Sequence, residues 1–341
     1  TTSTTSTTST TTSTTSTTKT TSTTSTTSTT TTAYDSCKLF HANITSCMNV
    51  ILGLSLRWNQ TGTTVAGGSS GSGANQFNKA AWVEIDENDT MYVADHHGYR
   101  VQKYVKGATS GVTVVDAIPT GDHPESITFD KDGYMYMAGH TNNRVIRYPP
   151  NSGVGTNVAG TLGSSTTALT DLSDPLGMDL DDNLNLYIAE RKNKRVVKWA
   201  RNAAAGTIVI GPSSTSGFYG ILLSLYSSNQ AYVSSEETDS VYLWTFGASS
   251  PSVTLTQVNA TTATLNAPRG MEYDTYGNLY VVDRTNKRVV MYCVNSTVGK
   301  VVAQDSTQTS LDSPLDLAFD SDLNLYVVDD AAEKVVKYTK L

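Results

Sequence analysis

Histidine is the residue type in this sequence with the widest chemical use, and four of the five histidines lie in one region: His96, His97, His123 and His140. An imidazole ring can transfer a proton near neutral pH or hold a metal ion. A metal site needs several such rings in contact. Whether these four can act together depends on the elements that carry them.

Two other motifs match known site patterns without the context that the chemistry requires. Residues 67–71 (GGSSG) match G-x-S-x-G, but that motif needs a strand leading into a helix, and more glycine and serine follow here. Residues 130–133 (DKDG) resemble the start of a calcium loop but lack its twelve-residue ligand set and terminal glutamate. We expect a flexible loop at the first motif and a β-turn at the second.

A fourteen-residue pattern occurs six times after residue 79. Its second position is always tyrosine, and another aromatic residue always follows twelve residues later. The leading tyrosines are Tyr92, Tyr136, Tyr187, Tyr232, Tyr280 and Tyr326. The aromatic residues that follow them are Tyr104, Tyr148, Trp199, Trp244, Tyr292 and Tyr338. Successive copies lie 44 to 51 residues apart, a period typical of propellers and solenoids.

Each repeat has the pattern of four short strands. A strand such as 177–180 precedes the tyrosine-led strand, and a polar turn then leads to a strand such as 195–199, rich in valine. A β-branched run such as 207–210 follows. Short β-branched segments bounded by Gly, Asn or Asp are typical of strands. Four strands in each of six repeats predict an all-β fold, a six-bladed β-propeller over residues 58–341.

The two ends of this region indicate how the ring closes. The last repeat stops three residues after Tyr338, so its fourth strand is missing. A strand-like run at 62–67, preceded by Trp58, belongs to no repeat of its own. We predict that this N-terminal run is the outer strand of the sixth blade, which would remove an open sheet edge.

The repeats resemble the NHL-repeat family of six-bladed propellers, whose pattern is Pro-x-Gly-φ-x-φ-Asp, then φ-Tyr-Val-Ala-Asp, then Asn-x-Arg-Val. The resemblance covers residues 58–341. The fourth repeat departs from it at Tyr226, Ser235 and Ser240, where the family has Asp, Asp and Arg. The resemblance implies the fold but not the function, because the family includes lyases, lactonase-like relatives, RNA binders and interaction scaffolds.

Charged residues recur at fixed positions of the repeats, and we expect them to be structural. The acids are Asp95, Glu190, Asp283 and Asp329, and the bases are Arg100, Arg144, Arg195, Arg288 and Lys334. Catalysis breaks the symmetry of a repeat protein, whereas structure keeps it. We therefore predict ion pairs or hydrogen bonds within each blade at these positions.

The histidines break this symmetry, because all four fall in the first two repeats. The turns and the connection that carry them share one face in a propeller, so a metal cluster is geometrically possible. Amidating lyases of the family bind metal with histidines from several blades around the channel, whereas repeats three to six here have none. We therefore expect turn or surface histidines and predict no catalytic residue, no cofactor and no metal. The only metal candidates are His97, His123 and His140.

The N-terminal segment has a different composition. Residues 1–32 contain only threonine, serine and one lysine, with serine recurring every third residue, and cannot form a core. A period of three would suit an extended polyproline II rod. We predict a mucin-like arm with O-linked sugars on most of its threonines. These include Thr1, Thr2, Thr4, Thr5, Thr7, Thr8, Thr14, Thr15, Thr23 and Thr24.

Residues 33–57 form a connector that contains two of the three cysteines, Cys37 and Cys47. We favour a disulfide between these two, with Cys293 as a buried thiol. A bridge from Cys293 to either of them, or an intermolecular bond, remains open.

Several features favour a secreted protein. Asn-X-Ser/Thr sequons occur at Asn43, Asn59, Asn88, Asn259 and Asn295, where we predict N-linked glycans. The net charge of −7 disfavours binding to nucleic acid or anionic lipid. The longest apolar stretch, at 50–56, is far shorter than the ~20 residues that a membrane span needs.

From these features we predict a non-enzymatic extracellular structural or adhesive protein. Its partners would be its own copies, joined through the arm into a fibre or matrix, together with covalent glycans. Two alternatives remain. One is a metal-dependent lyase or lactonase-like hydrolase at the mouth of the propeller channel, and the other is a ligand- or glycan-binding head on a stalk.

Overall fold

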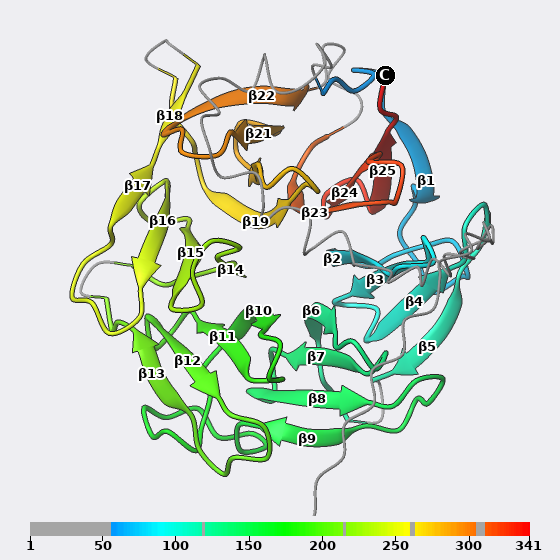
Figure 1. Cartoon of the computed structure of the whole chain (residues 1–341). Coiled ribbons are helices and arrows are strands. Elements are labelled where there is room, and N and C mark those ends of the chain that lie inside the picture. The colour runs from blue at the N-terminus through cyan, green and yellow to red at the C-terminus, as the bar shows by residue number, and fades with distance from the viewer. Residues whose placement is uncertain (1–55, 118–119, 214–215, 260–262, 305–310) are drawn as a thin grey trace, which may run out of the picture.

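Six sheets surround a common axis and form a six-bladed β-propeller, which confirms the predicted fold (Figure 1). The structure is a computed structural model. It describes residues 56–341 except 118–119, 214–215, 260–262 and 305–310. All of the regular elements in these ranges are strands. No helix that is long and apolar enough to cross a membrane is found there.

Each blade has four antiparallel strands that run from the axis outward. Blade 1 contains β2 (Ala80–Ile85), β3 (Met91–Asp95), β4 (Arg100–Tyr104) and β5 (Val112–Asp116). Blade 2 contains β6 (Pro124–Phe129), β7 (Met135–Gly139), β8 (Arg144–Tyr148) and β9 (Thr156–Ala159). Blade 3 contains β10 (Pro175–Leu180), β11 (Leu186–Glu190), β12 (Arg195–Trp199) and β13 (Thr207–Ile210).

The second half of the ring is built in the same way. Blade 4 contains β14 (Ile221–Leu223), β15 (Gln230–Ser235), β16 (Ser240–Thr245) and β17 (Val253–Leu255). Blade 5 contains β19 (Pro268–Tyr273), β20 (Leu279–Asp283), β21 (Arg288–Tyr292) and β22 (Val298–Gln304), and β18 (Gln257–Val258) pairs in parallel with β22. Blade 6 contains β23 (Pro314–Phe319), β24 (Leu325–Asp329), β25 (Lys334–Tyr338) and β1 (Thr63–Gly67).

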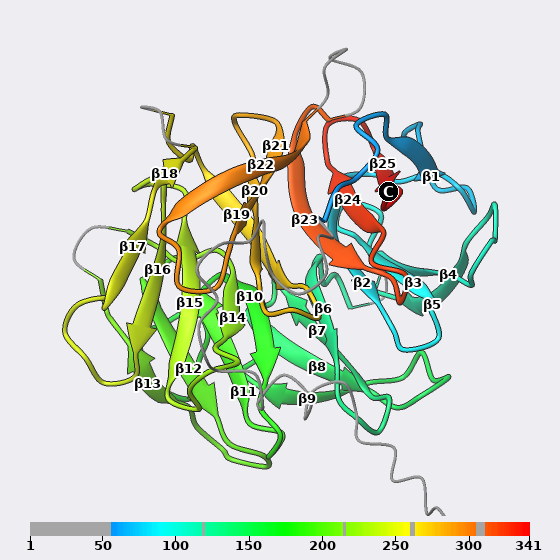
Figure 2. The same ribbon diagram turned by 45° about the horizontal axis from the view of Figure 1, so that its top comes forward.

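The N-terminal strand β1 closes the ring, as the sequence predicts. It pairs antiparallel with β25, and the two strands lie side by side in both ribbon views (Figures 1 and 2). Just before β1, the Trp58 side chain is buried and its Nε1 donates a hydrogen bond to the Leu323 carbonyl at 2.9 Å. The Trp58 ring also meets the Tyr280 ring edge-on at 5.6 Å between centroids, so the closing segment fills a gap between blades 5 and 6.

The repeated residues explain why each blade folds alike. Tyr136 of blade 2, for example, packs with Met178 and Ile188 of blade 3, so the apolar core lies between neighbouring blades. The Tyr136 hydroxyl donates to Asp130, whose other oxygen accepts from the backbone N–H groups of Asp132 and Tyr134. This contact confirms the predicted β-turn at 130–133. Tyrosine hydroxyls make the same bond in four other blades, to Asp86, Asp181, Asp274 and Asp320.

Residues 67–71 form the predicted loop. Gly67 is the last residue of β1 and residues 68–71 follow it, and the serines of the motif are exposed rather than held at the start of a helix. The serine of this motif is therefore not placed at the strand-to-helix turn that a nucleophile of this type needs.

The repeated ion pairs lie within single blades, as predicted. Arg100 bonds to buried Asp95 at 2.9 Å, and Arg195 and Arg288 contact Glu190 and Asp283 in the same way. Blade 2 has glycine at the acidic position, and a Cβ on Gly139 would lie 2.4 Å from Asp122 Oδ1. Asp122 thus occupies the missing side-chain position, and Arg144 pairs with it at 2.5 Å.

Cys293 corrects one prediction, because it is half-buried and disulfide-bonded rather than a buried thiol. This favours the alternative in which Cys293 bridges to another cysteine. Both Cys37 and Cys47 lie outside the described residues, as do Asn43 and the threonines of the 1–32 arm.

Candidate active site

The turn between the second and third strands of each blade begins with a side chain that lies at one end of the central channel. The residue type at this position changes around the ring, whereas the position just before it is acidic in four of the six blades. In blade order it holds His96, His140, Arg191, Glu236, Arg284 and Asp330. We call this ring of side chains, together with the residues at the start of the inner strands, the channel mouth.

Hydrogen bonds across the axis establish that these groups share one space. Glu125 is the second residue of β6 in blade 2, and its Oε1 accepts a 2.6 Å hydrogen bond from the Tyr219 hydroxyl of blade 4. Blade 3 separates these two blades, so the bond passes over the axis. Arg269 of blade 5 donates to the same hydroxyl through Nη1. Blades 2 and 5 are opposite in a six-membered ring, so Glu125, Tyr219 and Arg269 form a polar bridge across the channel.

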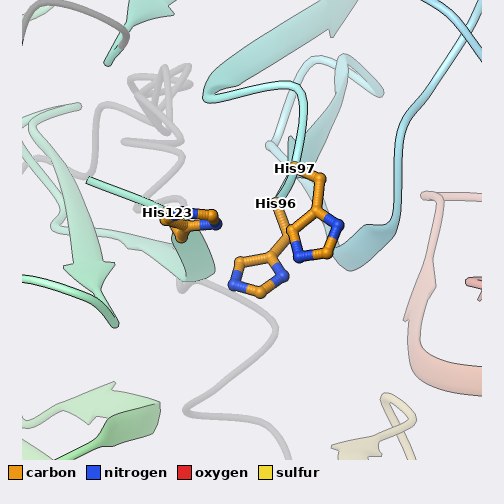
Figure 3. Close-up of side chains that lie close together, drawn as sticks. All are labelled: His96, His97 and His123. Carbon is orange, nitrogen blue, oxygen red and sulfur yellow. The ribbon is translucent and has the colours of Figure 1, made fainter. Parts of the chain in front are cut away.

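Three histidine rings gather on one side of the mouth (Figure 3). His96 and His97 lie in the turn after β3, and His123 immediately precedes β6. One nitrogen from each ring lies within 4.8 Å of the others. The three rings form a triangle, with the His96 centroid 4.8 Å from that of His97 and 4.7 Å from that of His123, and with His97 and His123 5.4 Å apart. We call these three residues the histidine cluster.

The environment favours the neutral form of the inner rings. Burial, followed by the charges of the neighbouring histidines, lowers the pKa of His96 to about 3. Burial also lowers the pKa of His123. Because His96 is then neutral, the 3.5 Å approach of Glu125 Oε2 to its Nε2 is not an ion pair. His96 Nε2 and His123 Nδ1 are buried, and no described residue forms a hydrogen bond with either.

His140 has a different environment. Its Nε2 lies 2.5 Å from Oδ1 of Asp174, and this hydrogen bond raises the pKa of His140. Burial alone would raise the pKa of Asp174, but the bond from His140 and the charge of Arg191 lower it. Arg191 Nε donates to the other Asp174 oxygen at 2.6 Å. A buried carboxylate therefore holds the His140 ring in a fixed orientation and favours its protonated form.

The cluster fits a divalent metal in its donor chemistry. Three neutral imidazoles with an open fourth position are a typical catalytic zinc set, and unpartnered buried nitrogens are the atoms that a cation would satisfy. Glu125 Oε2 lies 3.5 Å from Nε2 of His96, so an ion held by this nitrogen would have this carboxylate beside it. His96, His97 and His123 would therefore hold the ion, whereas His140 is committed to Asp174.

The structure corrects our view of the histidines. They lie in turns and connections, as predicted, but the fold brings the rings of His97 and His123 together with His96, which we did not select. His140 lies near but is not part of the cluster. Glu125, Asp174, Tyr219 and Arg269 could not be selected from the sequence, because the repeated pattern does not fix the residue type at their positions. The signal that could have revealed the site was the repeat position that holds histidine, arginine, glutamate or aspartate in different blades.

Comparison with known proteins identifies structures of the same fold but assigns the chain to no family. No protein-family model matches the chain, and no curated protein does, so the NHL likeness stays one of sequence pattern. A gluconolactonase from Xanthomonas campestris is similar in structure, with a TM-score of 0.58, 11% identity and coverage of 78% of this chain and 88% of that one. Virginiamycin B lyase from Staphylococcus aureus has a TM-score of 0.57, 10% identity and coverage of 83% and 99%.

A third similar structure is an auxiliary nutrient binding protein from Bacteroides thetaiotaomicron, with a TM-score of 0.60, 14% identity and coverage of 82% and 76%. These identities establish a shared fold alone. Our prediction that the chain is not an enzyme is nevertheless contradicted, because structural neighbours with this fold are a lactonase and a lyase. Proteins of the same architecture thus carry out catalysis.

Proposed function

We infer that the chain is a metal-dependent hydrolase or lyase with its active site at the channel mouth. The observation that carries this proposal is the histidine cluster: three ring nitrogens lie within 4.8 Å, and two buried ring nitrogens have no partner among the described residues. Histidines placed only for structure would form hydrogen bonds to neighbouring groups.

The residues around the cluster supply the other parts of such a site. A divalent cation, when bound, supplies a Lewis acid that polarises a substrate carbonyl. Glu125, held by the Tyr219 hydroxyl, lies beside Nε2 of His96, the nitrogen that would hold the ion. His140, whose Nε2 contacts Asp174, could in its protonated form donate the Nδ1 proton to a leaving oxygen. Arg191 stabilises the carboxylate that orients His140.

The substrate class that we propose first is a lactone or other cyclic ester, supported by the gluconolactonase among the structural neighbours. Hydrolytic ring opening of a lactone needs a water molecule that attacks the carbonyl carbon, polarisation of that carbonyl and a proton for the ring oxygen that leaves as an alkoxide, and this mouth offers residues for the last two. Elimination by a lyase is the closest alternative and would use the same groups. A nutrient-binding neighbour also favours simple ligand binding at this mouth as a second candidate.

The test is metal-dependent lactone hydrolysis. Protein stripped with a chelator is reloaded with zinc, manganese, magnesium or calcium and assayed on gluconolactone and related lactones by acid release. We expect activity only after reloading, and a loss of at least 100-fold in the His96→Ala and His123→Ala variants. The proposal would be rejected if the reloaded protein hydrolyses none of these lactones, or if both variants are as active as the wild type.

We also propose that the chain is secreted and N-glycosylated. Asn59, Asn88, Asn259 and Asn295, the four sequon asparagines that the structure describes, are all exposed. Enzymatic removal of N-glycans from protein made in a secretory host should lower its mass, and an unchanged mass would contradict this. O-glycosylation of the arm and assembly of copies through it also remain proposals, which rest on the sequence of residues 1–32.

A further inference from the structure

The side of the channel mouth opposite the histidine cluster is rich in guanidinium groups. In the six-membered ring, blade 4 faces blade 1 and blade 5 faces blade 2. Arg269 and Arg284 both come from blade 5, and Glu236 comes from blade 4. Both arginines contact the same Glu236 oxygen, Oε1. One carboxylate oxygen thus contacts both cations directly.

Arg269 is fixed in position before any ligand arrives. Its guanidinium carbon lies 3.8 Å from the centre of the Tyr219 ring, its Nη1 donates to the Tyr219 hydroxyl and its Nε donates to Glu236. Tyr219 is in turn anchored by Glu125, and both of these side chains are at least nine-tenths buried. A guanidinium held in this way loses little conformational entropy when it binds a ligand.

Several N–H groups here remain free to donate. No described residue accepts a hydrogen bond from Nη2 of Arg269 or from Nη2 of Arg284. Arg284 is also held at Nε by the Ser313 hydroxyl at 3.1 Å, while 34% of its side chain stays exposed. In blade 3, Arg191 uses only Nε, for Asp174, and 41% of its side chain is exposed.

We propose that Arg269 and Arg284, with Arg191 beside them, form an anion subsite that binds a carboxylate of the substrate. Planar guanidinium groups match the two oxygens of a carboxylate, and a partly desolvated site strengthens the bond. This deepens the proposed function on which it rests: the preferred substrate is an acidic ester or lactone, such as a sugar-acid derivative. Its carboxylate lies at blades 3–5 and its reacting carbonyl lies at the histidine cluster.

The experiment measures binding by metal-stripped protein, without turnover. Gluconate and sorbitol, which differ chiefly in the terminal carboxylate, are titrated by calorimetry. We expect gluconate to bind at least tenfold more tightly than sorbitol, and more weakly as salt rises. Arg284→Gln should remove most of this preference, and Arg284→Lys should restore part of it.

A matched control comes from the same turn. Lys287 is exposed and pairs with Asp312, so Lys287→Gln removes the same charge three residues away and should leave the preference unchanged. Melting curves verify that every variant folds. Equal affinity for gluconate and sorbitol, no measurable gluconate binding, or equal effects of the Arg284 and Lys287 substitutions would overturn the subsite.

The two proposals fail separately. A chain that hydrolyses lactones with bound metal but shows no carboxylate preference refutes only the subsite. A carboxylate preference that depends on Arg284, in a chain without metal-dependent activity, refutes only the enzymatic proposal.

Discussion

Replacement of Trp58 tests how the ring is closed. The Trp58 side chain is 2% exposed, and its ring packs against those of Tyr280 and Phe319. Truncation of a buried tryptophan to alanine costs about 3–5 kcal/mol. Trp58→Ala also leaves the Leu323 carbonyl without its indole donor, which adds about 1 kcal/mol. At about 2–4 °C per kcal/mol for a domain of this size, the combined loss of about 4–6 kcal/mol should lower Tm by roughly 8–24 °C.

Scanning calorimetry and urea unfolding measure this loss, and two variants bracket it. Trp58→Phe keeps the ring contacts and should cost only about 1–2 kcal/mol. Thr63→Ala, at an exposed position of the closing strand, should change stability by less than about 0.5 kcal/mol. If Trp58→Ala melts within 1 °C of the wild type, the closing segment does not stabilise the ring and our reasoning is wrong.

Two further predictions concern buried charge. Burial raises the pKa of Glu272 from 4.5 to about 7, so folding favours the protonated carboxyl, and this stabilisation is lost as pH rises from about 4.5 to 7. Calorimetry should therefore give a higher Tm at pH 5 than at pH 8, and Glu272→Gln should reduce this difference in Tm. If the variant shows the same difference as the wild type, the titration of Glu272 is not its cause. Arg195→Gln should cost about 3–5 kcal/mol of folding free energy, because it leaves Glu190 charged and buried, and it should not change the metal content. A Tm close to that of the wild type would show that the pair is not structural.

The fold could be predicted from the sequence because its determinants are local and repeated. The tyrosine of the second strand and the aromatic residue of the third strand recur in every blade. Within each blade the two residues lie on adjacent strands, only twelve residues apart in the sequence. Even the closing strand could be predicted, since the last repeat lacks an outer strand and residues 62–67 lack a partner. The repeated acids and bases, such as Asp95 and Arg100, could be assigned to structure for the same reason.

The site could not be assembled in this way, because it depends on contacts across the axis. Glu125 and Tyr219 are 94 residues apart, and neither occupies a position that the other repeats mark. His96 and His123 come into contact only because β6 starts beside the turn after β3. Symmetry identifies the scaffold, and the positions where symmetry fails, such as the first turn residue with its histidines, arginines and acids, identify the channel mouth.

The metal stoichiometry of the purified chain tests the central claim most directly. Protein incubated with zinc and freed of excess by gel filtration should carry about one ion per chain by plasma mass spectrometry. The His96→Ala/His123→Ala double variant should carry none while it melts like the wild type. Lys192→Ala, at the position in blade 3 that corresponds to His97, should keep the ion. A wild-type chain without bound metal, or a double variant that retains it, would contradict a metal site at the channel mouth.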